Sequence, residues 1–283
     1  MGAKISKSYI GKAKMLKSKF VSENIMDESD KLTIIGISLV ELFISNVKEG
    51  YKILYQKGIG QSLIENVIEL HKKEIINKIT GSSIIPFGDF NIIINYFRKG
   101  ENILIFITID KKENGIPYSQ LYLKYRKILK DFDPNKNIDT KQLVESSFTI
   151  PRIKNVDALF ILDNSGIPLI SKVNLKREQL KDESLQIGGL ISAILLFSAE
   201  ALDQETGAKL KEIKIGHKVF HLIIRKQVIC AFVLQNMTPI IKRYMYLITD
   251  QFIDMFSEVL ENFDGDTSQF YPFQEIIETY FDF

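Results

Sequence analysis

Hydrophobic residues along this chain follow one pattern twice, and the second copy is the clearer. Its strand-like runs are residues 158–163, 167–171, 218–224 and 228–234. A helical pattern separates the first pair from the second, with Ile187, Leu190, Ile191, Ile194, Leu195 and Leu202 at three- and four-residue spacings. Another helical pattern begins at Thr238-Pro239. This order of hairpin, helix, hairpin and helix predicts an α+β fold in which helices pack on an antiparallel sheet.

The first half of the chain repeats this order with weaker patterning. Its strand-like runs are residues 33–40, 50–56, 90–97 and 103–109. Helical patterns begin near Ser62 and at Pro117, the latter as expected for proline in a first turn. We therefore predict two copies of one domain, each with a five-stranded antiparallel sheet flanked by helices.

Changes in composition along the chain predict its domain boundaries. Residues 1–31 are expected to form a basic arm, because six lysines precede the first acidic residue, Glu23. Residues 32–150 then form the first domain, since a polar stretch and Pro151 precede the second copy. Residues 151–283 form the second domain, and they end in an acidic, aromatic tail.

Two stretches of the second copy resemble a known superfamily. Ala158-Leu-Phe-Ile-Leu-Asp-Asn-Ser-Gly-Ile-Pro-Leu is similar to the opening hairpin of longin and roadblock domains, and Ile187-Gly-Gly-Leu-Ile-Ser-Ala-Ile is similar to the start of their following helix. The resemblance implies tandem longin-like domains. Such proteins are generally not enzymes, so it further implies a platform that binds or regulates a small Ras-like GTPase in a trafficking-like or membrane-associated assembly.

Two other functions remain open at this point. The chain can be a structural scaffold that pairs with itself or with another longin or roadblock protein, without a GTPase. It can also be a module that senses a small molecule. An enclosed pocket with converging polar groups would favour sensing, whereas a large exposed apolar patch would favour either protein-binding role.

Composition and motifs exclude several other classes. With 283 residues and a net charge of +2, the chain is long enough for two domains and gives no general reason to expect nucleic acid. The single cysteine, Cys230, lies in an apolar run, and no apolar run has the length of a membrane-spanning helix, so we expect a cytoplasmic protein.

No catalytic or cofactor motif is evident in the sequence. Gly58-Ile-Gly60 lacks the lysine and spacing of a phosphate loop, and no serine elbow is present. His217 and His221 have no third metal ligand at a suitable spacing. The acidic loop that begins at Asp264 has Gln269 where a calcium loop needs glycine. We therefore expect no enzyme activity, no cofactor and no metal.

Two groups of residues are candidates for contact with partners. Small residues interleaved with apolar ones at Ile187, Leu190, Ile191 and Ile194 predict either packing of this helix on its own sheet or an interface with the other domain or a partner, and the broad apolar stripe of the last helix adds Ile240 and Leu247. A cationic arm with spaced apolar residues can contact an anionic membrane surface through Lys4, Lys7, Lys12, Lys14, Lys17 and Lys19. A simply solvated arm is the alternative.

Overall fold

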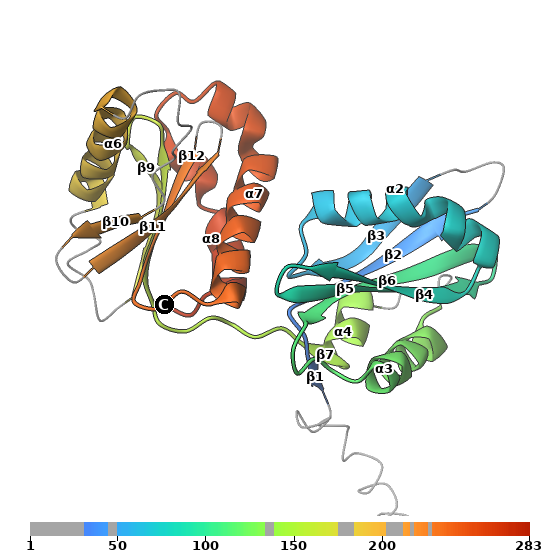
Figure 1. Cartoon of the computed structure of the whole chain (residues 1–283). Helices are drawn as coiled ribbons and strands as arrows, with labels where there is room; N and C mark the ends of the chain where they lie inside the picture. The colour runs from blue at the N-terminus through green and yellow to red at the C-terminus, as the bar shows by residue number, and fades with distance from the viewer. Residues whose placement is uncertain are drawn as a thin grey trace, which may run out of the picture. The chain divides into compact units, whose positions relative to one another are not determined.

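The computed structural model describes residues 31–44, 50–133, 139–174, 184–201, 212–215, 218–225 and 228–283. These residues form an α+β structure with two five-stranded antiparallel sheets and helices (Figure 1), so that part of the sequence prediction is confirmed. The chain divides into two compact units. The larger comprises Ile34–Gly115 and Ile150–Phe283 and contains both sheets, and the smaller comprises Met1–Thr33 and Ile116–Thr149.

The first sheet has the strand order β3-β2-β6-β5-β4. Its strands are β2 (Gly36–Phe43), β3 (Gly50–Lys57), β4 (Gly81–Phe87), β5 (Phe90–Lys99) and β6 (Asn102–Lys111). Helix α2 (Gln61–Lys78) connects β3 to β4 and lies over one face of the sheet (Figure 1). Its buried residues are Ile64, Val67, Ile68 and Ile75, whose spacing places them on one side of the helix.

The second sheet has the strand order β10-β11-β12-β8-β9. Its strands are β8 (Val156–Asp163), β9 (Pro168–Val173), β10 (Glu212–Ile215), β11 (Lys218–Arg225) and β12 (Val228–Leu234). Helix α6 (Ser184–Ala201) connects the second strand to the third. In each sheet the chain therefore enters at the strand next to the centre, adds the outer strand, and returns through a helix to the opposite edge. The two halves have the same topology.

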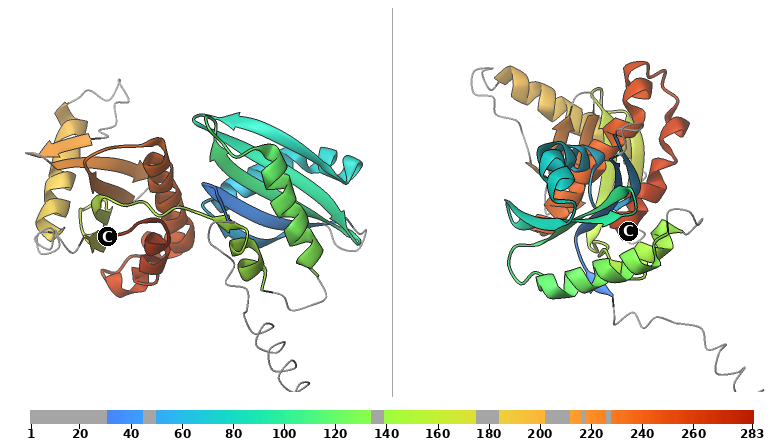
Figure 2. Two further views of the ribbon diagram at one scale, coloured as in Figure 1. Left: turned by 90° about the horizontal axis from the view of Figure 1, so that it is seen from below. Right: turned by 90° about the vertical axis from the view of Figure 1, so that its right-hand side faces the viewer.

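Helices cover both faces of the second sheet. In Figures 1 and 2, α6 lies on one face, and α7 (Pro239–Glu261) and α8 (Phe273–Tyr280) lie on the other. Helix α7 begins with proline in its first turn, and the side chain of Thr238 caps it by accepting a hydrogen bond from the amide of Ile241 at 3.3 Å. Its buried face packs on β11 and β12.

The aromatic segment after α7 folds back onto that helix. A short 3-10 helix, η4 (Thr267–Phe270), leads into α8. The ring of Phe252 on α7 lies 5.4 Å from Phe270 and 5.1 Å from Phe273, and both of these side chains are fully buried. The residues expected to form a tail are therefore part of the hydrophobic core of the second sheet.

Backbone hydrogen bonds join the end of this segment to the start of the second domain. The amide of Ile153 donates to Tyr280 O at 2.7 Å, and the amide of Asp282 donates to Ile153 O at 2.9 Å. A parallel bridge pairs Ile153 with Phe281. The Arg152 guanidinium also lies 3.2 Å from the Asp282 carboxylate. The residues after α8 therefore hold the chain that enters β8.

The smaller unit contains two short parallel strands and two helices. Strand β1 (Leu32–Thr33) pairs with β7 (Phe148–Thr149), and the helices are α3 (Tyr118–Asp131) and α4 (Thr140–Glu145). The Asp139 carboxylate caps α4 by accepting from the amides of Lys141 and Gln142. The rings of Tyr125 and Phe148 lie 5.9 Å apart within this unit. In the part of the chain that the structure describes, no helix is long and apolar enough to cross a membrane.

Candidate functional site

The predicted interface on α6 divides between core and surface. Ile191 is fully buried, and Ile187 and Ile194 are partly buried against the apolar core of the second sheet. Leu190, in contrast, is 44% exposed, and Leu185, five positions earlier on the helix, is 64% exposed. The stripe identified from the sequence therefore contains both residues that attach α6 to its sheet and residues that face outward.

Two glycines bring α6 close to the β8–β9 turn. A Cβ atom on Gly188 would overlap the carbonyl oxygen of Gly166, and Gly166 itself has a φ of 89°. Both positions therefore need glycine, because side chains are disfavoured at positive φ and no space is left between the backbones. At the next position, Gly189, nothing lies within 4 Å of a Cβ atom built on the backbone. The outer side of α6 is open at this point.

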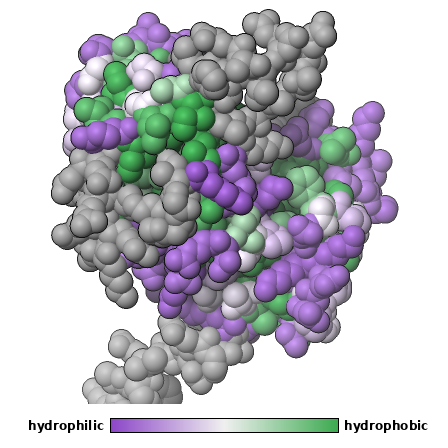
Figure 3. All heavy atoms as spheres, turned by 60° about the vertical axis from the view of Figure 1, so that its left-hand side comes forward, coloured by the Kyte–Doolittle hydropathy of each residue, from purple (hydrophilic) through white to green (hydrophobic). Residues whose placement is uncertain are grey.

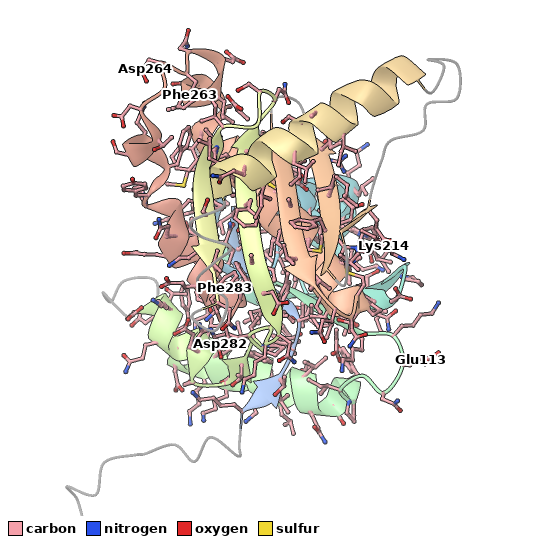
Figure 4. The ribbon with its side chains drawn as sticks, turned by 90° about the vertical axis from the view of Figure 1, so that its left-hand side faces the viewer. Glu113, Lys214, Phe263, Asp264, Asp282 and Phe283 are labelled. Atoms are coloured by element: carbon pink, nitrogen blue, oxygen red, sulfur yellow. The ribbon has the colours of Figure 1, made fainter. Side chains whose placement is uncertain are left out.

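Helix α6 differs in charge from α2, its counterpart in the first sheet. Helix α2 carries six charged residues over its 18 positions, whereas α6 carries one, Glu200, near its end. Figure 4 shows α6 crossing the strands of its sheet, and Figure 3 shows hydrophobic residues gathered over the described part of this face. A surface helix usually has a polar outer face, so an uncharged one is typical of a surface that another molecule covers.

A second feature of the larger unit is a set of buried and partly buried hydrogen bonds that we call the Gly58 seam. It consists of Ile35, Gly58, Arg243, Tyr244 and Tyr280. The Tyr244 hydroxyl donates to Ile35 O at 3.0 Å, and the Tyr280 hydroxyl accepts from the amide of Gly58 at 3.0 Å. The Arg243 guanidinium donates to Gly58 O at 2.7 Å. Three side chains from α7 and α8 thus form hydrogen bonds with backbone groups of the residue before β2 and of the residue after β3.

Burial shifts the ionisation of the seam. Desolvation raises the pKa of the Tyr244 and Tyr280 hydroxyls, and it lowers the pKa of the Arg243 guanidinium to about 10. The tyrosines therefore stay protonated and the arginine stays charged at neutral pH. The guanidinium also lies 5.8 Å from the centre of the Phe90 ring, a favourable cation–π distance.

Beside the seam is a cleft of about 480 Å³, which we call the α7 cleft. Three elements form it: the first turn of α2, the β4–β5 turn with residues 87–90, and one side of α7. Phe87, Phe90, Tyr246 and Leu247 provide much of its apolar wall. The volume is in the range of ligand sites, but the cleft is only partly enclosed.

The predicted residues Ile240 and Leu247 both lie on α7. Leu247 is buried, lines the cleft, and would lie 3.5 Å from a Cβ atom at Gly60 on the first turn of α2. Ile240 is partly buried. The sequence identified α7 as a helix with a broad apolar surface but not the polar residues of the seam, which are Arg243, Tyr244 and Tyr280.

Charged residues are unevenly distributed along the cleft. Lys242 and Arg243 lie near the start of α7, and Asp89 on the β4–β5 turn also lines the cleft. Asp250 and Asp254 follow one turn apart at the other end. Desolvation raises the pKa of Asp250, whose carboxylate lies 3.9 Å from the Arg225 guanidinium. The far end of the cleft is therefore acidic.

The other polar groups considered from the sequence are two histidines and an acidic turn. Among the described residues, no group of three or more His, Cys, Asp and Glu side chains is placed to hold a metal ion. His221 lies 3.1 Å from the Glu212 carboxylate across the β10–β11 pair, while His217 is outside the described residues. Asp264 and Asp266 accept hydrogen bonds from nearby amides in their own turn. The six lysines of the arm, Lys4, Lys7, Lys12, Lys14, Lys17 and Lys19, also lie outside the described residues.

Three buried groups predict a loss of stability at alkaline pH. Desolvation raises the pKa of Cys230 from 9.0 to about 12, and it also raises those of Tyr244 and Tyr280 above 10.0. Each group binds its proton more tightly in the folded chain, so its contribution is complete below the unfolded pKa and is lost as pH rises toward the folded one. The free energy of unfolding should therefore fall from about pH 9 upward.

The variant Cys230→Ala checks this expectation. It removes the group with the lowest unfolded pKa, so the decline should begin nearer pH 10, where the tyrosines ionise. Urea denaturation at a series of pH values measures both onsets. An unchanged onset in the variant would show that Cys230 does not contribute.

Comparison with known proteins adds no family assignment. No protein-family model matches this sequence, and no curated protein matches it.

Proposed function

We propose that this protein is a non-enzymatic platform of two longin-like domains that binds or regulates a small Ras-like GTPase. The resemblance of the opening hairpin and of the helix start at Ile187 supports the longin-like assignment. The strand order shared by the two sheets also supports it, because a hairpin, a long helix, a three-stranded meander and closing helices are the order of longin domains. The function of such domains is binding, so the proposal depends on a surface rather than on a catalytic group.

The uncharged outer face of α6 is the observation that carries the proposal. Leu185 and Leu190 are exposed on it, and Gly189 leaves space for the backbone of a partner to approach. The same position in the first sheet has the charged helix α2, so the topology itself does not require an apolar surface here. We assign this face of α6 to the GTPase.

An open cleft favours protein binding over small-molecule sensing. The polar groups of the α7 cleft are spread along the helix from Lys242 to Asp254 rather than converging on one point. We further propose a cytoplasmic protein whose basic arm, residues 1–31, attaches it to an anionic membrane surface. A simply solvated arm is the alternative. Pairing with another longin or roadblock protein is the second candidate, since the apolar face of α6 would suit that partner too.

Charge introduced on α6 is expected to abolish capture of the GTPase. In the double variant Leu185→Lys and Leu190→Lys, partner binding would bury two ammonium groups, which is unfavourable without counter-charges. The wild-type protein should retain a small GTPase from a lysate of the source cells, in amounts that differ between GDP and a GTP analogue. The double variant should retain at least about tenfold less, as expected for loss of two central contacts. Mass spectrometry of the retained proteins measures both.

Leu70→Lys is the matched control on α2. Leu70 is 78% exposed on the corresponding helix, so its replacement changes the same residue type without touching α6. Capture should be unchanged in this variant. If the double variant instead loses a longin or roadblock partner, the second candidate is correct. If size-exclusion chromatography shows that it converts a dimer to a monomer, the face binds a second copy and the GTPase proposal is wrong.

A further inference from the structure

The α7 cleft lies on a different helix from the surface assigned to the GTPase, and it has its own chemistry. Phe87 is 51% exposed on its rim, and Phe90 and Leu247 are buried in its wall. A rim aromatic beside buried apolar side chains is a suitable contact for one apolar side chain of a bound molecule. The cleft can therefore anchor a ligand at this end without forming a closed pocket.

Beyond this apolar part, two carboxylates follow in line. Tyr246, Asp250 and Asp254 are four residues apart along α7, so successive positions are separated by about 6 Å on one side of the helix. Alternate residues of an extended peptide are separated by about 6.6 Å and point to the same side. An extended chain lying along α7 would therefore bring every second side chain opposite one of these three positions.

We propose that the α7 cleft binds an extended segment of a partner protein, in which an apolar residue is followed by basic residues two and four positions later. The apolar side chain lies against Phe87 and Tyr246, and the two basic side chains pair with Asp250 and Asp254. Charge complementarity is the argument for this occupant. The Asp254 carboxylate has no ion pair in the described part of the chain, and Asp250 has only the 3.9 Å contact with Arg225.

The cleft suits a protein segment better than a compact ligand. Its polar groups extend over about 12 Å from Tyr246 to Asp254, whereas a small ligand would need them close together. The cleft is only partly enclosed, so the rest of a bound segment can extend into solvent.

Selection from a random heptapeptide library displayed on phage tests the proposal with the full-length protein. Peptides with an apolar residue and basic residues at the second and fourth following positions should be enriched. In the variant Asp250→Lys with Asp254→Lys, binding of the selected peptides should fall at least about tenfold, because both ion pairs become repulsive. Both carboxylates are exposed, so circular dichroism should show an intact fold.

Glu258→Lys with Glu261→Lys is the matched control. These exposed acids lie on the same helix but do not line the cleft, and their replacement changes the net charge equally. Peptide binding should be retained there and lost in Phe87→Ala, which removes the anchor contact. Equal binding to both double variants, or enrichment of peptides without basic residues, overturns the proposal.

A truncated chain that lacks residues 1–30 tests whether the occupant of the cleft is a partner protein or the basic arm of this same chain. The arm has the same spacing at Ile10, Lys12 and Lys14 and again at Met15, Lys17 and Lys19. Removing the arm should leave the affinity for the selected peptides unchanged. A rise of about tenfold or more would show that the arm competes for the cleft, and a partner segment would then be the wrong occupant.

Discussion

Replacement of Gly58 by alanine is expected to lower the free energy of unfolding by about 2–5 kcal/mol. The backbone at Gly58 has a φ of 71°, which costs about 1–2 kcal/mol for a residue with a Cβ atom. The new Cβ would also lie 2.3 Å from Ile35 O and 2.8 Å from the Cα atom of Gly36. Both are backbone atoms of β2 and its approach, so relief requires movement of the strand, at about 1–3 kcal/mol.

Gly100→Ala separates the conformational cost from the overlap. Gly100 has a φ of 63°, close to that of Gly58, but nothing lies within 4 Å of a Cβ built there. Its replacement should cost only about 1–2 kcal/mol. Urea denaturation followed by circular dichroism gives both values. If the two variants lose equal stability, the close approach of Gly58 to β2 does not matter, and only its positive φ does.

Replacement of Phe273 by alanine is the second change with a large expected effect, about 3–5 kcal/mol. The side chain is fully buried, and its ring lies 5.1 Å from Phe252 and 6.1 Å from Phe256. Truncation removes buried apolar surface and leaves a cavity between α7 and α8. Because Tyr280 is on the same helix, the variant should also weaken the Gly58 seam. Thermal and urea unfolding measure the loss.

Tyr271→Ala provides the comparison. Tyr271 is aromatic and only two positions away, but it is 56% exposed. Its loss should change stability by less than about 0.5 kcal/mol, as is usual for surface positions. Similar losses in the two variants would mean that the segment after α7 contributes little to the core, contrary to the ring contacts.

The hydrophobic pattern was sufficient to predict both sheets but not every strand in them. Eight of the strands lie in runs that alternate or are continuously apolar, such as β5 and β12. The strand-like runs do not include β4, whose sequence contains a proline, Pro86, a residue that is unusual inside a strand. Proline is accommodated there because β4 is at the edge of the sheet. Strand β10 has only four residues, two of them charged, which is too short for a pattern.

The candidate sites were predictable to different degrees. Phe273, Ile277 and Tyr280 are spaced four and three residues apart, so their helical stripe could have identified α8 as a core helix. The uncharged character of α6 is also visible in the sequence. The Gly58 seam is not, because Tyr244 and Tyr280 act through single hydroxyl groups on backbone atoms of residues far away in the chain. The set of residues that line the α7 cleft is not visible either, because they come from separate parts of the chain.

The Gly58 peptide group also sets a constraint on the order of folding. Its amide is bonded by a side chain 222 positions later, and its carbonyl by one 185 positions later. During synthesis, β2 and β3 can form their own hairpin early, but the amide of Gly58 cannot form its native hydrogen bond until Tyr280 has left the ribosome. Contacts across such long separations slow folding, because the chain loses entropy in closing the loop before the contact forms. The final packing of the chain immediately after β3 is therefore expected to be a late, post-translational step.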